Sequence, residues 1–184
     1  MATNRRPPVP RAAPLDPPRL EALALAYVAR FATSAATCER YLRRKLRERG
    51  WDGPGEPPLA ELIARFVRNG FIDDAAFARA RTGGLLRRGY GQARIGQALG
   101  AAGIAAELRE ELRPDMAAQR QSALALARKR RFGPYGAAEL DRPRREKQIV
   151  AMLRAGHPLD SARELVNAAS VAAAEHWAAQ GDDR

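Results

Sequence analysis

The sequence predicts an all-α protein, an elongated array of three tandem three-helix repeats, and three observations support this. Apolar residues recur at helical spacing along most of the chain, between glycine and proline stops. Aromatic residues make up only 6% of the sequence, and alanine is abundant, which favours closely packed helices over a sheet. Gly50, Gly103 and Gly156, each at the end of an amphipathic segment, are separated by equal steps of 53 residues. The alternative is one irregular helical bundle in which these glycines coincide by chance.

The chain divides into five predicted segments. Six prolines among residues 1–18 argue against a helix there, so we expect a disordered Pro/Arg-rich tail. Three-helix repeats are expected over 19–72, 73–114 and 115–179, and residues 180–184 should fray.

The first repeat should open near Arg19 with a helix that presents one apolar face. That face comprises Leu20, Leu23, Ala24, Tyr27 and Phe31. Thr33 or Ser34 can cap a second helix, which runs to about Arg49 and stops at Gly50. A third, strongly amphipathic helix should follow from Leu59 to Gly70 after a proline- and glycine-rich loop.

The middle repeat has the clearest pattern, with helices expected near 74–88, 91–102 and 105–113. Asp73 is placed to cap the first of them, and Gly89-Tyr90-Gly91 breaks the chain before the second. Six apolar residues should share one core: Phe77, Leu85, Ile95, Leu99, Ile104 and Leu108.

The third repeat begins near Met116 and contains a Gly/Pro loop over 132–143. Its second helix should stop at Gly156. Its final helix should open near Asp160 or Ser161 and can extend to Trp177.

Composition limits the classes of function. The net charge is +11, from 32 Lys+Arg against 21 Asp+Glu, which suggests a polyanion or an acidic protein surface as partner. No phosphate-binding glycine loop, zinc ligand set or catalytic constellation is recognisable, so we expect no enzyme activity, no cofactor and no metal. The single Cys38 and the absence of an apolar signal or membrane-spanning run predict a cytoplasmic protein with no membrane partner, expected to be a monomer.

Basic side chains form three groups that are candidates for binding a partner. Four arginines recur at positions i, i+3, i+4 and i+7 of one helix, opposite its apolar face: Arg40, Arg43, Arg44 and Arg47. The second group surrounds the Gly/Pro loop: Arg128, Lys129, Arg130, Arg131, Arg144, Arg145 and Lys147. The third lies in the middle repeat: Arg87, Arg88 and Arg94. Aromatic residues are not interleaved with these arginines, which argues against a base-stacking platform.

The run from Gly70 to Ile104 resembles the hallmark of the RecX family, regulators of the bacterial recombinase RecA. The matching elements are Gly70-Phe71-Ile72-Asp73-Asp74, Phe77-Ala78, Arg87-Arg88-Gly89 with Gly91, then Ile95, Leu99 and Gly103-Ile104. The sequence departs from the family where Ala35 follows Ser34 in place of a frequent arginine, and where Cys38 replaces an expected leucine.

The resemblance implies tandem three-helix repeats and a protein that binds RecA filaments on single-stranded DNA. Such proteins lie along the filament groove and suppress ATP hydrolysis and strand exchange, so the implied partners are the RecA filament, single-stranded DNA and, by extension, duplex DNA. The alternative is a helix-turn-helix-like regulator that reads duplex sequence. Gln92 and Gln97 are the base-reading candidates in the second helix of the middle repeat.

Overall fold

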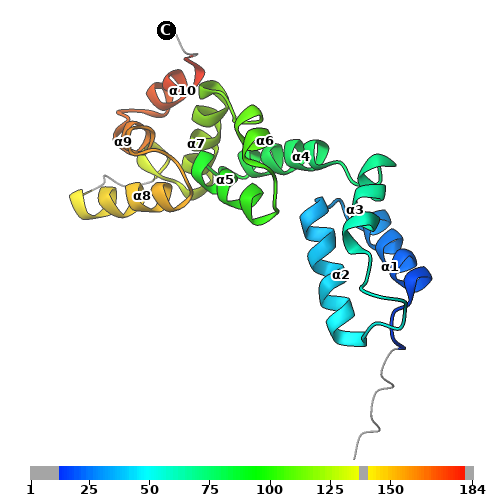
Figure 1. Cartoon of the computed structure of the whole chain (residues 1–184). Coiled ribbons are helices and arrows are strands. Elements are labelled where there is room, and N and C mark those ends of the chain that lie inside the picture. Colours follow the sequence, from blue (N-terminus) through cyan, green and yellow to red (C-terminus); the bar gives the residue numbers. More distant parts are fainter. Residues whose placement is uncertain (1–12, 137–140, 181–184) are drawn as a thin grey trace, which may run out of the picture. The chain divides into compact units, whose positions relative to one another are not determined.

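A computed structural model describes residues 13–136 and 141–180, and apart from one isolated bridge their regular secondary structure is helical (Figure 1). They contain ten α-helices, one 3-10 turn and no strand, which confirms the all-α prediction. The chain separates into two compact units that divide between Asp73 and Asp74.

The first unit holds the first predicted repeat. Its helices are α1 (Pro17–Arg30), α2 (Ala35–Arg49) and α3 (Leu59–Arg68). The core they enclose is built mainly from buried aliphatic residues and one phenylalanine: Leu15, Leu20, Ala24, Cys38, Leu42, Leu62, Ile63, Phe66 and Ile72. Of the two candidate caps for α2, Ser34 has this role, because its hydroxyl accepts a hydrogen bond from the Thr37 N–H.

The prediction that the tail continues to residue 18 is wrong for its last residues. Leu15 is fully buried and forms an isolated parallel bridge with Trp51. Its N–H donates to the Gly50 carbonyl over 3.0 Å, so this short extended segment belongs to the core of the first unit. The rest of the predicted tail, residues 1–12, lies outside the described residues.

The prolines of this segment start α1. Asp16 caps the helix, and Pro17 and Pro18 occupy its first two positions. Proline is well suited to this place, because the first N–H groups of a helix have no partner within the helix and the ring already holds a helical φ.

The second unit contains the helices expected of the second and third repeats. The middle three are α4 (Asp74–Arg87), α5 (Gln92–Ala101) and α6 (Ala106–Glu111). The remainder are α7 (Met116–Arg130), the 3-10 turn η1 (Gly133–Tyr135), α8 (Arg142–Arg154), α9 (Leu159–Asn167) and α10 (Val171–Ala179). All six residues predicted to share the middle core do so, with Phe77 and Leu108 at its partly exposed edge.

The three equally spaced glycines occupy equivalent places in the fold. Gly50 follows α2, Gly103 follows α5 and Gly156 follows α8, each after the second helix of its group. Their φ angles are +86°, +76° and +96°. This left-handed region suits glycine, which explains why the stop residue recurs at this position.

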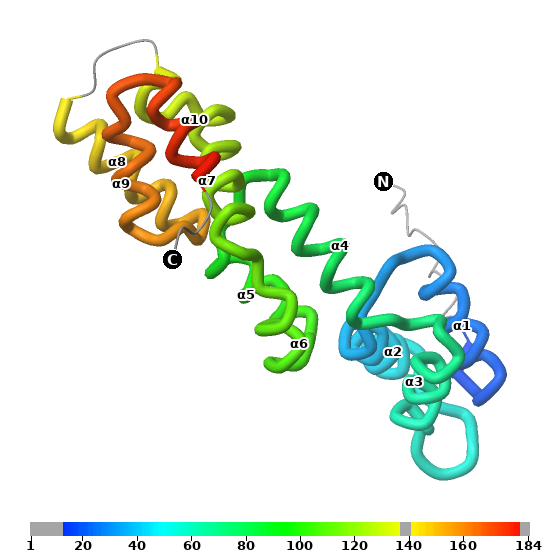
Figure 2. Tube along the Cα trace, turned by 90° about the horizontal axis from the view of Figure 1, so that it is seen from above, coloured from blue at the N-terminus to red at the C-terminus, as the bar shows by residue number. Residues whose placement is uncertain are grey.

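The end of the chain differs from its prediction. The helix predicted from Asp160 or Ser161 does not continue to Trp177, because α9 ends at Asn167 and a separate helix, α10, begins at Val171. Ser170 starts α10 by accepting a hydrogen bond from the Ala173 N–H over 3.1 Å. Figure 2 shows α10 beside α7, the helix on which it packs, so the last repeat carries a fourth helix. The Gln180 N–H still donates to the His176 carbonyl, whereas residues 181–184 lie outside the described residues.

Two glycine turns meet inside the second unit and join the middle helices to the last ones. The Gly91 N–H donates to the Ala155 carbonyl over 2.9 Å, and the Ala93 N–H donates to the Gly156 carbonyl over 3.2 Å. A side chain at Gly91 would lie 2.3 Å from the backbone of Gly156, too close for any Cβ. The buried His157 places its Nε2 3.0 Å from the Gly89 carbonyl. We call this contact the glycine seam.

Candidate nucleic-acid and protein interface

The four arginines of α2, which we call the arginine stripe, are all exposed, as the helical spacing predicts: Arg40, Arg43, Arg44 and Arg47. On the opposite side of the helix, Cys38 and Leu42 are fully buried. Burial of that face directs the arginines to solvent, since residues at this spacing lie on one side of a helix.

The four arginines differ in their contacts. Arg43 donates from both Nε and Nη2 to one oxygen of Glu39, the Nε bond being 3.0 Å long. Arg44 lies 3.6 Å from Glu48, which also accepts a 2.6 Å hydrogen bond from Lys45. That Lys45 contact holds the pKa of Glu48 below its usual range, so Glu48 remains ionised at neutral pH.

The other two arginines of the stripe form no close ion pair with a carboxylate of the described residues, although the charge of Arg47 also helps to lower the pKa of Glu48. Arg40 donates to the Thr37 hydroxyl over 2.9 Å, a neutral contact. The most available positive charge of the stripe therefore lies at Arg40 and Arg47.

Aromatic side chains lie beside the stripe, contrary to the sequence expectation. Tyr41 follows Arg40 on α2, whereas Tyr27, near the end of α1, and Phe31, just after that helix, are distant in sequence. Together with Thr37 and three stripe arginines they line one hollow, which we call the aromatic hollow: Tyr27, Phe31, Thr37, Arg40, Tyr41, Arg44 and Arg47. Phe31, expected on the buried face of the first helix, is 49% exposed. Sequence reasoning missed this cluster because helix packing, not local spacing, brings α1 beside α2.

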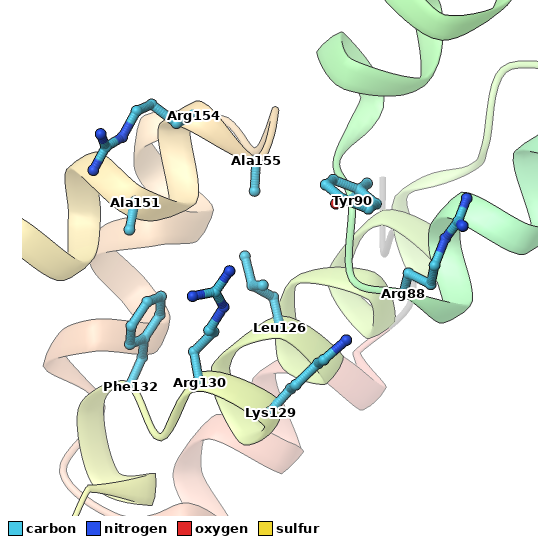
Figure 3. Close-up of a pocket in the computed structure, with 9 residues that line it drawn as sticks. All are labelled: Arg88, Tyr90, Leu126, Lys129, Arg130, Phe132, Ala151, Arg154 and Ala155. Carbon is cyan, nitrogen blue, oxygen red and sulfur yellow. The ribbon is translucent and has the colours of Figure 1, made fainter. Parts of the chain in front are cut away.

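A second basic surface lies in the second unit. A pocket of about 310 Å³ opens between the turn after α4, the end of α7 and the end of α8 (Figure 3). Four basic residues line it together with two aromatic and three aliphatic ones: Arg88, Lys129, Arg130 and Arg154, then Tyr90 and Phe132, then Leu126, Ala151 and Ala155. We call it the basic pocket.

The basic pocket joins residues that the sequence placed in separate groups. Arg88 was assigned to the middle repeat, whereas Lys129 and Arg130 were assigned to the loop group. Arg154 was not a candidate, although its place in the last turn before the stop glycine of α8 is a signal that could have found it. In Figure 3 the Arg130 side chain extends between Leu126 and Phe132, whereas the Arg154 guanidinium points away from them.

The remaining predicted basic residues do not line either hollow. Arg128 pairs with Glu175 over 2.6 Å, and Arg144 lies 3.9 Å from Asp141, so part of their charge is compensated. Arg94 contacts Gln97 near the glycine seam. The others are exposed on the ends of α4, α7 and α8: Arg87, Arg131, Arg145 and Lys147.

Other kinds of site receive no support from the described residues. No group of three histidine, cysteine or acidic side chains in them could hold a metal ion. Cys38 is completely buried, and burial raises the pKa of its thiol to about 11, which disfavours a nucleophilic thiolate. None of the described helices has both the length and the apolar character needed to cross a membrane.

Tandem three-helix units with a basic hollow on each compact unit define an all-helical repeat protein with basic surfaces. Residues 73–112 match the family model for the second three-helix domain of RecX. The chain is 28% identical over 173 residues to the regulatory protein RecX of Myxococcus xanthus (strain DK1622), covering 89% of this chain and 91% of that protein. The fold matches the crystal structure of RecX from Lactobacillus salivarius with a TM-score of 0.64 at 18% identity, over 81% of this chain and 93% of that one. Residues 73–112 therefore correspond to a RecX-type three-helix domain, and most of the chain is similar to a RecX regulatory protein.

Proposed function

We propose that this protein binds the RecA filament on single-stranded DNA and inhibits its ATPase and strand-exchange activities, thereby regulating recombination and DNA repair. The observation that carries the proposal is the exposed arginine stripe on α2, in a chain that is similar to a RecX regulatory protein over most of its length. A filament on DNA presents phosphates and protein carboxylates, and arginine can bind either group through two parallel hydrogen bonds.

Inhibition of RecA by binding alone does not require a catalytic site on this protein. A ligand that binds one filament conformation more tightly than another shifts the filament toward that conformation, by as much as the two affinities differ. A repeat protein with basic surfaces on both of its compact units has several points at which such preferential contact can be made.

The alternative function is a helix-turn-helix-like regulator that reads duplex sequence, for which α5 would be the recognition helix. The start of that helix is occupied, because the N–H groups of Gly91 and Ala93 bond to carbonyls of the α8–α9 turn. Recognition helices usually contact bases with their N-terminal residues. Gln97 already accepts a hydrogen bond from Arg94. These contacts favour the RecA proposal, and competition binding among mixed duplexes would reveal a sequence preference if the alternative holds.

The proposal is tested by reversing the two stripe charges that form no close ion pair with a carboxylate of the described residues. Arg40→Glu with Arg47→Glu should raise the concentration needed to inhibit the DNA-dependent ATPase of RecA by about tenfold or more, since each lost charge-assisted contact is worth on the order of 1.5–3 kcal/mol. Folding should survive, because exposed substitutions usually change the free energy of unfolding by about 0.5 kcal/mol or less.

The matched control is Arg68→Glu with Arg163→Glu, which alters net charge equally at two exposed positions outside the three basic groups. It should inhibit nearly as well as the wild type. A folded stripe variant that inhibits as strongly as the wild type would exclude the stripe as the contact surface. Lys129→Glu with Arg130→Glu in the basic pocket would then be the next pair to measure.

A further inference from the structure

We propose that the aromatic hollow is a binding site for single-stranded DNA, in which an unpaired base stacks on Phe31 and the stripe arginines hold the adjoining phosphates. The inference deepens the proposed function by naming the ligand of one surface, and it rests on that function only for its biological role. Direct binding to DNA can be measured without RecA.

The aromatic part of the hollow is already arranged as a stack. The Tyr27 and Tyr41 rings lie 4.0 Å apart at their centroids, with an angle of 9° between their planes. The Phe31 ring lies 5.4 Å from Tyr27 at 48° and forms the exposed end of this cluster. The Arg30 guanidinium lies 5.5 Å from the centroid of the Phe31 ring, yet the residue remains 49% exposed, which leaves apolar ring surface on which another flat ring can be buried.

The charged residues that line the hollow are all basic. Three arginines line the hollow, and none of its lining residues is acidic. The Arg44 guanidinium lies 5.6 Å from the centroid of Tyr41, so a cation is next to the ring stack. Arg40 and Arg47 form no close ion pair with a carboxylate of the described residues, which leaves both available for phosphate oxygens.

The size of the hollow also suits this ligand. Its volume is about 560 Å³, within the range of about 300–1,000 Å³ that is usual for small-molecule sites. A nucleotide unit therefore has room beside the rings while its backbone continues along the open side.

Single-stranded DNA fits these features better than other polyanions do. Proteins that bind single strands without reading sequence combine a positive groove with aromatic rings on which successive bases stack. In a duplex the base faces are covered by their neighbours, so the Phe31 ring would have no partner. An acidic protein surface could satisfy the arginines, but it would leave the exposed ring without a flat apolar ligand.

The test measures the affinity of the full chain for a fluorescent oligothymidine of about 16 nucleotides, by anisotropy and without RecA. Phe31→Ala should weaken binding by between about 5-fold and about 150-fold, the range that corresponds to stacking of one base. The matched control is Phe71→Ala, because Phe71 belongs to the same unit, is 51% exposed and does not line the hollow. This control should bind like the wild type.

A second probe separates stacking from charge. An abasic strand of equal length keeps the phosphates but lacks the bases, so the wild type should bind it more weakly than oligothymidine. Phe31→Ala should lose most of this difference, whereas Arg40→Ala with Arg47→Ala should weaken both strands and reduce the salt dependence of binding.

Several results would overturn the proposal. The wild type could bind abasic and thymidine strands with equal affinity, or single strands and duplex with equal affinity, or neither kind of DNA. Phe31→Ala and Phe71→Ala could also weaken binding to oligothymidine equally. Circular dichroism of each variant establishes that it is folded. If the protein inhibits RecA but shows none of the expected DNA binding, only this site is refuted. If it binds single-stranded DNA as expected but does not inhibit RecA, only the proposed function is refuted.

Discussion

Arg43 and Arg47 lie one turn apart on α2, yet their surroundings differ. Arg43 donates two hydrogen bonds to the carboxylate of Glu39, whereas Arg47 lines the aromatic hollow. An exposed ion pair of this kind contributes only about 0–1 kcal/mol to stability, but it offsets the charge that a partner meets. The Glu39 contact therefore leaves Arg40 and Arg47 as the stripe arginines whose charge is least compensated.

His157 is the residue whose protonation should govern the glycine seam. Its burial lowers the pKa of the imidazole, and the hydrogen bond with the Gly89 carbonyl only partly opposes this effect. The folded pKa is therefore below the unfolded value of about 6.5. Consequently the unfolded state binds the proton more readily, and the contribution of His157 to stability is complete above about pH 6.5 and is lost as the pH falls below it.

We expect the thermal unfolding midpoint of the wild type to decrease as the pH is lowered from about 7.5 to about 5.5. His157 should contribute at most about 1.4 kcal/mol per pH unit to the change in the free energy of unfolding. His157→Gln should flatten the decrease, because the amide can still donate to the Gly89 carbonyl but does not titrate in this range. His176→Gln is the control, since His176 is exposed on α10. An unaltered pH dependence in His157→Gln would contradict the assignment.

At the scale of the elements, the glycine seam determines how the middle helices join the last ones. Two helix-connecting turns approach so closely that their backbones share hydrogen bonds, which is possible only without side chains between them. The Ser122 hydroxyl on α7 lies 3.1 Å from the Leu86 carbonyl and 2.9 Å from the Tyr90 carbonyl, and it shares its single proton between these two acceptors. The basic pocket borders this seam, because Tyr90 and Ala155 line it.

Gly91→Ala should destabilise the second unit by about 1–3 kcal/mol, the usual cost of forcing an extra methyl group into a packed site. The backbone at Gly91 has a φ of −81°, so alanine adopts it without strain and the effect reports only the close contact with Gly156. Gly96→Ala on the same helix has open space around its Cβ and should stabilise by roughly 0.5–1 kcal/mol. Chemical denaturation of both variants measures this difference, and equal stabilities would show that the seam tolerates a side chain.

At the scale of the whole molecule, charge is the dominant property. The net charge of +11 is spread over basic surfaces on both compact units, whose attraction for a polyanion acts over about 10 Å at moderate salt. Long-range attraction of this kind raises association rates and makes the bound state dependent on counterions.

The concentration of protein that half-inhibits the RecA ATPase should therefore rise steeply between about 50 mM and about 200 mM salt. The variant Arg40→Glu with Arg47→Glu should show a shallower dependence, because fewer counterions are released. The ATPase of RecA alone at each salt concentration is the control, since its own binding to DNA is sensitive to salt. Inhibition that is constant over this range would mean that binding is not driven by the basic surfaces.

The sequence by itself determined the helices up to α9, their stops and most of their buried faces. The equal glycine steps located three left-handed positions, and the apolar spacing identified the core of the middle helices from Phe77 to Leu108. These features follow from local rules, because period, capping and φ preference act within a few residues. The exposure of the arginine stripe followed from the same rules.

Tertiary structure decided which elements meet. Leu15 enters the first core through a pairing with Trp51, and Phe31 is left exposed beside the arginines of another helix. Arg88 reaches the same pocket as Arg130 because two glycine turns dock. Periodicity shows which side of a helix is apolar, but it does not show which partner covers that side or which residues lie at the edge of the contact. Both hollows are formed at such edges, and only the packing of the helices places their residues together.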